Sequence, residues 1–268
     1  MDPIIIFGVA ALILVIAIGG AVRRARNSKK VQGLAAERGW RYEKSDAGVL
    51  STYPQLFPFY SHGEGRSKPG ISFGDRVSGE ARDVLYLTEG EYSGQSFTYT
   101  YTTYERDSDG DTSSKKHYWH VVGFELPTAF PNLTIRRRRK LDFFENKLTK
   151  PVDLPYSELN SAYTIHSEHA PAALDIVTAA MAQWLVREQF RAEIVLQDRR
   201  VYVYTKGRQK IENIDPMVKQ IIDFLAHIPQ EAWQKTRGEY PQPQRVKYVE
   251  SLDLNQMKSA YDDWRESQ

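Results

Sequence analysis

Two histidines and a glutamate stand close together in "HSEH", and these residue types suit metal binding or acid–base catalysis. His166 and Glu168 face one side of a predicted strand, and His169 follows near its end. Imidazole and carboxylate groups bind zinc and carry protons in hydrolases. The spacing matches no helix-borne zinc motif and no third ligand is identifiable, so we interpret the stretch as a polar strand edge and assign no catalytic, metal-binding or cofactor-binding residue. A metal-assisted hydrolase using His166, Glu168 and His169 is the alternative function.

Two further stretches resemble ligand-binding loops only superficially. The aspartates of "DSDGD" (107–111) alternate as in a calcium loop, but Thr112 and Tyr118 stand where that loop requires glycine and glutamate. "HGEGRSKPG" is rich in glycine but lacks the Gly-Lys-Ser/Thr ending of a phosphate loop. We interpret both as solvated loops and expect no cofactor.

Basic residues gather in two clusters that suit acidic lipids. One follows the N-terminal apolar run, and the other is "RRRRK", whose arginines would alternate between the two faces of a strand, so that one pair could simply cover the sheet with its stems. A domain tethered near an anionic leaflet gains on the order of 1 kcal/mol for each basic residue that approaches it. The residues that we predict as acidic-lipid contacts are Arg23, Arg24, Arg26, Lys29, Lys30, Arg136, Arg137, Arg138, Arg139 and Lys140.

The N-terminal apolar run predicts a membrane anchor. No charged side chain occurs from Ile4 to Val22, and at about 1.5 Å per residue this run matches the hydrocarbon core of a bilayer. Asp2 precedes the run and arginines follow it, which is the reverse of a signal peptide. Because basic flanks stay on the cytoplasmic side, we predict a single-pass protein of the inner (plasma) membrane with its N-terminus outside. The opposite insertion and an envelope-facing domain are the alternatives.

The composition of the chain limits the kinds of site and the classes of partner that we expect. The 268 residues include no cysteine, which excludes disulfides, thiol catalysis and cysteine-rich zinc sites. The net charge is +2 with interspersed signs, so the chain lacks the field of a nucleic-acid binder. The aromatic residues Phe97, Tyr99, Tyr101, Tyr118 and Trp119 could stack bases, but we interpret them as sheet core. We expect the membrane, acidic lipids and an unidentified protein as partners, and no nucleic acid.

The elements that must position these residues are a mixture of helices and strands. Alternation predicts a hairpin over 83–105 with a "YSG" turn, strands over 117–126 and 132–139, and a hairpin over 190–207 about "QDRR". Helical spacing predicts one helix from Pro171 through Leu185 and another from Asp215 to the residue before Pro229. The fold class is therefore α+β, a single N-terminal transmembrane helix followed by a domain of antiparallel strands with helices packed on one side. Its predicted parts are residues 1–3 outside the cytoplasm, a transmembrane helix over 4–22, a basic juxtamembrane segment over 23–30, the cytoplasmic domain over 31–235 and a polar, flexible tail over 236–268.

Several stretches resemble a family of uncharacterised actinobacterial single-pass membrane proteins of unknown function. The likeness runs from Val31 to Pro229 and rests on "AAERGWRYEKSD", "VVGFELPTAFPNLTI", "SELNSAYTIHSEHAPAALDIVTAAMAQWLV" and "DRRVYVY" in that order. The chain departs from the family at "IRRRRK", where relatives are more acidic. The resemblance implies the fold and carries no catalytic residue. We therefore expect a membrane-anchored protein whose cytoplasmic domain is a binding or scaffolding module.

Overall fold

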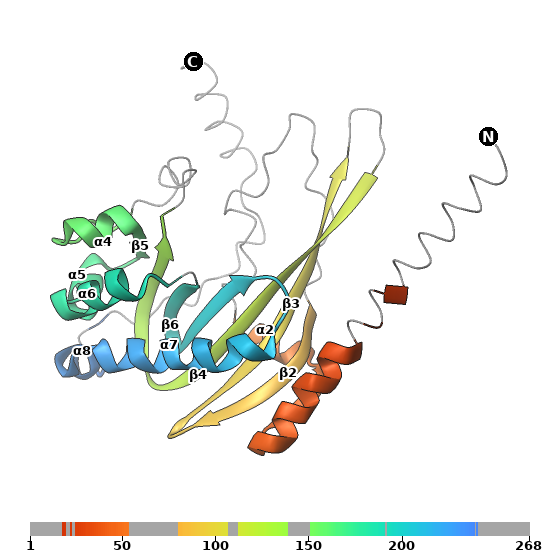
Figure 1. Cartoon of the computed structure of the whole chain (residues 1–268). Coiled ribbons are helices and arrows are strands. Elements are labelled where there is room, and N and C mark those ends of the chain that lie inside the picture. The colour runs from red at the N-terminus through yellow and green to blue at the C-terminus, as the bar shows by residue number, and fades with distance from the viewer. Residues whose placement is uncertain are drawn as a thin grey trace.

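The computed structural model of the chain describes residues 18, 19, 22, 25–53, 80–106, 112–138, 151–190, 192–238 and 240. These residues form an α+β fold built on one antiparallel sheet, which confirms the predicted class (Figure 1). The strands are β1 (Arg41–Ser45), β2 (Glu80–Glu89), β3 (Tyr92–Arg106), β4 (Thr112–Arg137), β5 (Tyr163–Ser167) and β6 (Glu193–Lys206). The helices are a first helix over residues 25–38, α2 (Ala47–Ser51), α4 (Ser157–Ala162), α5 (Ala170–Ile176), α6 (Ala179–Glu188), α7 (Ile211–His227) and α8 (Gln230–Lys235).

The long strand β4 lies at the centre of the six-stranded sheet. The strand order is β1-β2-β3-β4-β5, and β6 pairs with the other edge of β4. The first half of β4 lies between β3 and β6. In the second half, Ile135 is in register with Ile165 of β5 and with Ile194 of β6. One strand therefore holds both halves of the sheet together.

Strands β4 and β6 are each continuous, so two predictions are wrong. We predicted separate strands over 117–126 and 132–139, and a hairpin about "QDRR" within 190–207. Instead β6 pairs antiparallel with β4 from Ile194 to Lys206, and the register shifts twice between Glu125 and Leu133 of β4. The polar stretch "QDRR" is a bend within one strand, not a turn between two.

The residues at this bend explain its position. Proline has no backbone N–H and is tolerated in a strand where the ladder is interrupted, and Pro127 and Pro131 both fall within the shifted region of β4. On β6, Asp198 takes a left-handed φ of 50° opposite Phe130. The two strands therefore bend together.

The turn of the first hairpin also differs from the prediction. Strands β2 and β3 do form a hairpin, but Glu89 pairs with Tyr92, so the turn is Gly90–Glu91 and "YSG" is already in β3. Gly90 has a φ of 58°, a conformation that glycine adopts without steric cost.

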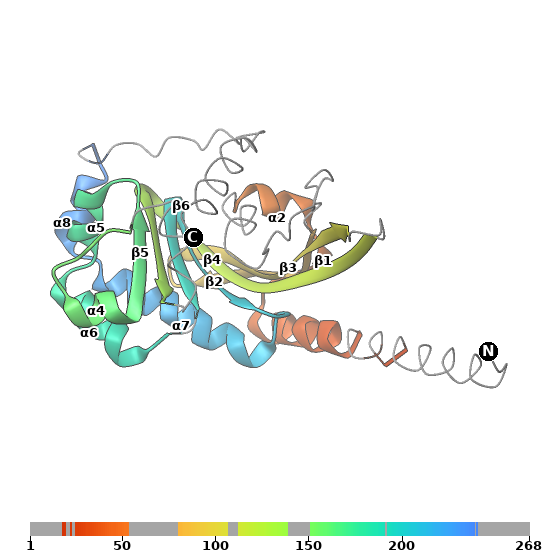
Figure 2. The same ribbon diagram turned by 90° about the horizontal axis from the view of Figure 1, so that it is seen from above.

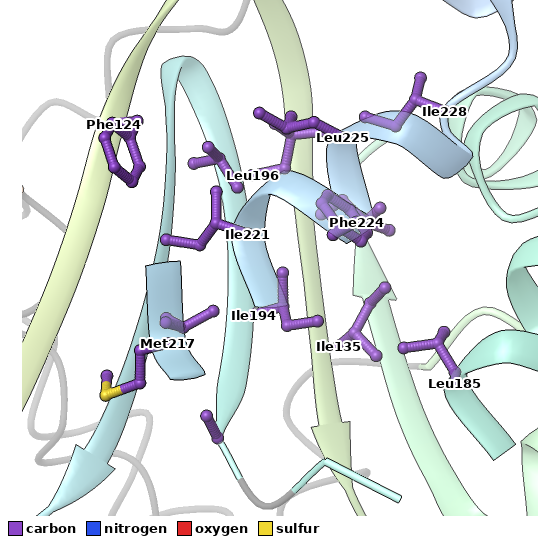
Figure 3. Close-up of a cluster of buried hydrophobic side chains, with 14 of the residues drawn as sticks. Phe124, Ile135, Leu185, Ile194, Leu196, Met217, Ile221, Phe224, Leu225 and Ile228 are labelled. Carbon is purple, nitrogen blue, oxygen red and sulfur yellow. The ribbon is translucent and has the colours of Figure 1, made fainter. Parts of the chain in front are cut away.

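Most helices cover one face of the sheet and bury the main hydrophobic core there. Helix α7 packs Met217, Ile221 and Phe224 against Ile194 and Leu196 of β6, as Figure 3 shows. Each such side chain contributes about 1.5–3 kcal/mol when it is removed from water. This core is the main support of the sheet.

Two helix boundaries differ from the sequence prediction. The single helix expected from Pro171 through Leu185 is broken at Val177, so that α5 and α6 are separate helices. Helix α7 begins at Ile211 and not at Asp215. The break agrees with tertiary packing, since Val177 is 0 % exposed and remains in the core despite its non-helical backbone.

Helix α2 lies on the opposite face, so the prediction that the helices pack on one side is wrong (Figure 2). Val49 and Leu50 of α2 join the core of that face together with Tyr53. The Tyr53 hydroxyl donates to Gln95 Oε1 at 2.6 Å. Gly123 makes room for the ring, because a Cβ there would lie 2.6 Å from Tyr53 Cε1.

Aromatic side chains of the central strands are buried on the same face as α2. Phe97, Tyr99, Tyr101 and Trp119 are all 7 % exposed or less. The interpretation of these four residues as sheet core is confirmed, and they are not available as a stacking platform.

The predicted transmembrane helix over 4–22 falls almost wholly outside the described residues, as do residues 1–3. Among the residues that the structure describes, no helix is both long enough and apolar enough to cross a bilayer. Residues 18, 19 and 22 are helical. Of the predicted tail over 236–268, only 236–238 and 240 are described.

Candidate functional site

The first helix is docked on the sheet face that carries the main core. Val31 is 0 % exposed and Ala35 is 2 % exposed, and their spacing of four residues places them on one stripe of the helix. Both join the hydrophobic cluster that contains Leu85 of β2. The helix that follows the predicted anchor is therefore part of the folded domain.

This helix includes most of the basic segment over 23–30 that we predicted as a separate unit. Residues 25–30 form its first turns. It ends at Gly39, which takes a φ of 68°, and Trp40 N donates to Ala35 O at 2.8 Å across the helix end.

Asp83 ties the first helix to the first two strands. A β-bulge interrupts the pairing between Arg82 and Leu85, and Asp83 there has a φ of 53°. Its Oδ1 accepts hydrogen bonds from Ser28 Oγ at 2.6 Å and from the Tyr42 hydroxyl at 2.9 Å. Burial and the hydrogen bond to Asp83 raise the pKa of Tyr42 to about 12, so this hydroxyl stays a donor at neutral pH.

Gln209, in the turn between β6 and α7, is a second tie to the first helix. It is 0 % exposed, and its carbonyl oxygen accepts a hydrogen bond from Asn27 Nδ2 at 3.2 Å. Its side-chain Nε2 donates to Ser96 Oγ at 2.8 Å, and its backbone N donates to Thr98 Oγ1 at 2.9 Å. One glutamine thus joins the first helix, the β6–α7 turn and β3.

His120 extends this buried polar cluster into the centre of the sheet. Its Nε2 lies 3.1 Å from Ser96 Oγ, and the residue is 1 % exposed. Burial lowers the pKa of His120 to about 3, so the imidazole is neutral at physiological pH. A general acid or base works best with a pKa near the working pH, which indicates a structural role for this histidine.

An ion pair closes the far end of the docked helix. An Arg38 guanidinium nitrogen lies 2.9 Å from Asp215 Oδ2 of α7. The two side chains are 43 % and 59 % exposed, so the pair contributes at most about 1 kcal/mol. The buried contacts, not this pair, hold the helix.

The outer surface of the first helix carries the predicted basic residues. Arg26, Lys29 and Lys30 are exposed, while Arg23 and Arg24 lie outside the described residues. Toward the N-terminus the exposed side chains are apolar, since Ile18 is 54 % exposed and Val22 is 44 % exposed.

The described arginines of the second basic cluster differ in exposure. Arg137 and Arg138 are exposed at the end of β4, and Arg139 and Lys140 lie outside the described residues. Arg136 is 2 % exposed, and a side chain buried to this extent cannot reach a lipid headgroup without leaving the core. We therefore leave Arg136 out of the lipid contact that we predicted for it.

Arg136 instead lies near a buried acidic group. The Tyr204 hydroxyl donates to Glu193 Oε2 at 2.6 Å. Burial, with the charge of Glu193 next in size, raises the pKa of Tyr204 well above its ordinary value, and the charge of Arg136 opposes the shift. Because buried charges are costly unless they are compensated, Arg136 and Glu193 are best understood as part of the core.

The two basic clusters lie at opposite ends of the molecule. Arg137 pairs with Tyr163 of β5, and β5 lies at the end away from the first helix in both Figure 1 and Figure 2. A bilayer crossed by a helix that extends from residue 25 would meet the end of the domain where the first helix emerges.

The residues of "HSEH" lie at the end of β5 and just before α5. His166 is half-buried on β5 in register with Thr134, and Glu168 is exposed. His169 is the N-cap of α5, where its Nδ1 accepts a hydrogen bond from Ala172 N at 3.2 Å. Within the described part of the chain, no group of three or more His, Asp or Glu side chains is placed to hold a metal ion.

Sequence reasoning missed Asp83, His120 and Gln209. Only His120 had a local signal, because alternation along β4 places it on the same face as Val122 and Phe124, where an apolar residue is expected. Asp83 and Gln209 matter through partners far along the chain, and nothing in their neighbouring residues indicates this.

Comparisons with known proteins give a distant structural likeness. No protein-family model matches the chain, and no curated protein matches it. A solved structure described as the crystal structure of the mycobacterial trehalose monomycolate transport factor A, TtfA, is similar to the chain with a TM-score of 0.43 and 12 % sequence identity. That likeness covers 76 % of this chain and 95 % of the other.

Proposed function

We propose that this is a single-pass protein of the inner (plasma) membrane, anchored by residues 4–22, whose α+β domain lies in the cytoplasm and acts as a binding or scaffolding module. The observation that carries the proposal is the docking of the first helix directly after the apolar run. Val31 and Ala35 are buried in the core, while Arg26, Lys29 and Lys30 of the same helix are exposed. Such a basic flank favours retention on the cytoplasmic side.

The exposed apolar side chains before residue 25 support the anchor. Ile18 and Val22 are helical and exposed. Exposed apolar side chains suit a protein or membrane contact. A bilayer would remove both side chains, and the apolar run before them, from water.

The polar groups of the domain support a module that binds, not one that catalyses. His120 has a pKa near 3 and holds the sheet to the β6–α7 turn, and His169 caps a helix. The buried hydrogen bonds link the first helix to the sheet, so the domain is built to keep a fixed relation to the anchor.

A topology measurement tests the proposal. A reporter that is active only in the cytoplasm, fused after Gln268, should be active, and protease added to intact cells stripped of their outer wall should leave the domain uncut. Cleavage of the domain by external protease would refute the cytoplasmic placement.

Replacing the basic residues beside the anchor with neutral ones tests whether they set the orientation of the chain. Changing Arg23, Arg24, Arg26, Lys29 and Lys30 to glutamine should give a mixture of the two orientations, because little charge bias would remain beside the anchor. An unchanged single orientation would mean that another feature of the chain sets the topology.

A further inference from the structure

A third group of basic residues lies in the turn between β6 and α7. Lys206, Arg208 and Lys210 are exposed, whereas Gln209 between them is 0 % exposed. The three basic side chains of the turn therefore face the solvent, whereas the side chain of Gln209 is buried. The basic clusters identified from the sequence did not include this turn.

The turn is rigid, so its charges have defined positions. Gly207 has a φ of 115° and its N donates to Tyr118 O at 2.7 Å. The Arg208 guanidinium carbon lies 4.1 Å from the centroid of the Tyr118 ring, a cation–π contact. The hydrogen bonds of Gln209 to Ser96 and Thr98 connect the turn to β3.

The turn lies beside the basic part of the first helix. Asn27 Nδ2 donates to the carbonyl oxygen of Gln209, so residues 206–210 are next to the first turn of that helix. Figure 2 shows the start of α7 alongside the first helix. The exposed basic residues of these two neighbouring segments are Arg26, Lys29, Lys30, Lys206, Arg208 and Lys210.

Among the described residues, the acidic side chains that contacts or sequence place beside this surface are Asp83, Asp215 and Glu212. Asp83 accepts hydrogen bonds from Ser28 and Tyr42, and Asp215 pairs with Arg38. Glu212 in the first turn of α7 is the acidic residue closest in sequence to the turn. The surface therefore keeps a positive balance and suits a ligand that carries many negative charges.

We infer that residues 206–210, together with Arg26, Lys29 and Lys30, form a surface that binds the acidic lipid headgroups of the bilayer in which the chain is anchored. The inference rests on the proposed function, because the anchor brings this end of the domain to the bilayer. Tethering makes the contact intramolecular, so several weak interactions act together. Arg137 and Arg138, at the β5 end, take no part in it.

The test uses the full chain in lipid nanodiscs of phosphatidylcholine, with and without phosphatidylglycerol. Because the chain has no cysteine, Asn213→Cys near the turn and Ala180→Cys on α6 can each carry one dye, with an acceptor dye on the headgroups. The probe at position 213 should move closer to the headgroups when acidic lipid is present, and the probe at 180 should not. The difference should vanish at about 1 M salt, where the Debye length is about 3 Å.

Matched variants separate this surface from the arginine cluster. Lys206→Gln, Arg208→Gln and Lys210→Gln together should lower the contact equilibrium by about 100-fold, which corresponds to about 1 kcal/mol for each charge. Arg137→Gln, Arg138→Gln and Arg187→Gln remove the same charge from exposed positions elsewhere and should leave the transfer efficiency unchanged. A loss in the second variant only, or equal transfer in both kinds of nanodisc, would overturn the inference.

The same preparation distinguishes failure of the inference from failure of the proposed function. A chain that enters neutral nanodiscs but does not respond to phosphatidylglycerol has an anchor and lacks this lipid surface. A chain that does not enter nanodiscs of either composition has no anchor, and the proposed function fails with the inference. RNA that binds the full chain and competes with acidic lipid only in the wild type would assign the surface to nucleic acid and overturn the inference as well.

Discussion

His120 illustrates how a single residue joins parts of the chain that are distant in sequence. It lies 3.1 Å from Ser96 on the neighbouring strand, and Ser96 accepts a hydrogen bond from Gln209, which is 113 residues away along the chain. A neutral imidazole can take part in such a cluster inside the sheet, whereas a charged one would require desolvation of its charge. The stability of the domain should therefore depend on pH through this residue.

We predict that acid destabilises the domain partly through His120. Its pKa is about 3 in the folded chain against about 6.5 when unfolded, so the unfolded state binds more protons below pH 6.5 and stability falls as pH is lowered. Between pH 7 and pH 4 the free energy of unfolding of the wild type should fall by about 3 kcal/mol more than that of His120→Gln. Urea unfolding of the full chain in detergent, followed by tryptophan fluorescence, measures this difference.

The matched control is Gln183→Ala on the exposed side of α6, which should lose as much stability as the wild type between pH 7 and pH 4. Parallel curves for the wild type and His120→Gln would show that His120 is not held neutral in the folded state. The comparison between variants removes the contribution of the carboxylates, which titrate in the same range in all of them.

The burial of Arg136 could not be predicted from the residues near it in sequence. Strand alternation correctly predicts that the arginines of "RRRRK" differ in direction, and Arg137 is exposed while Arg136 is 2 % exposed. Which arginine is buried depends on Glu193 and Tyr204 of β6, more than fifty residues later in the chain. Nothing near Arg136 in sequence indicates those partners.

At the scale of elements, the alternation of apolar residues predicted the strands and misplaced their boundaries. In β6, Ile194 and Leu196 face the main core before Asp198, and Val201 and Val203 face it afterwards, so the alternation changes phase at the bend. A change of phase beside polar residues is also typical of a hairpin turn. Only the register with β4, which changes at the same place, distinguishes a bulge from a turn.

The first helix provides the second prediction at this scale. We expect Val31→Asp to undock residues 25–38, because a carboxylate would enter a position that is 0 % exposed without a compensating charge, at a cost of several kcal/mol. Amide hydrogen exchange over 25–38 should become faster in the full chain, and exchange in α6 should not change. Gln32→Asp is the matched control, since it places the same side chain on the exposed side of the same helix.

Equal exchange over 25–38 in the two variants would contradict the docked helix. Faster exchange throughout the domain in Val31→Asp would instead mean that the first helix supports the whole fold. In that case the milder Val31→Ala, which removes two methyl groups without adding charge, should show faster exchange in the first helix alone.

At the scale of the whole molecule, the sequence predicts an anchor and a domain but not how they are joined. Hydropathy and basic residues locate the anchor, and the helical stripe of Val31 and Ala35 predicts that the next helix has a buried side. The contacts that receive this helix come from Asp83, 55 residues from Ser28, and from Gln209, 182 residues from Asn27. Such distances along the chain leave no local pattern.

This docking has a consequence for the orientation of the domain. Under the proposed membrane anchor, a first helix fixed to the sheet by Val31, Ala35, Ser28 and Asn27 would set the direction of the domain relative to the bilayer. We then expect the first helix to lie nearer the bilayer than β5, which lies at the other end of the domain (Figure 2). A flexible linker in the same place would allow every orientation.

The most direct test is a distance measurement by pulsed electron resonance on the full chain in nanodiscs. Spin labels at Gln32→Cys on the first helix and Lys219→Cys on α7 occupy exposed positions in a chain that otherwise has no cysteine. We predict one narrow distance distribution that is the same in neutral and acidic nanodiscs and broadens when Val31→Asp is added. A broad distribution in the unsubstituted helix would contradict the docking of the first helix on the sheet.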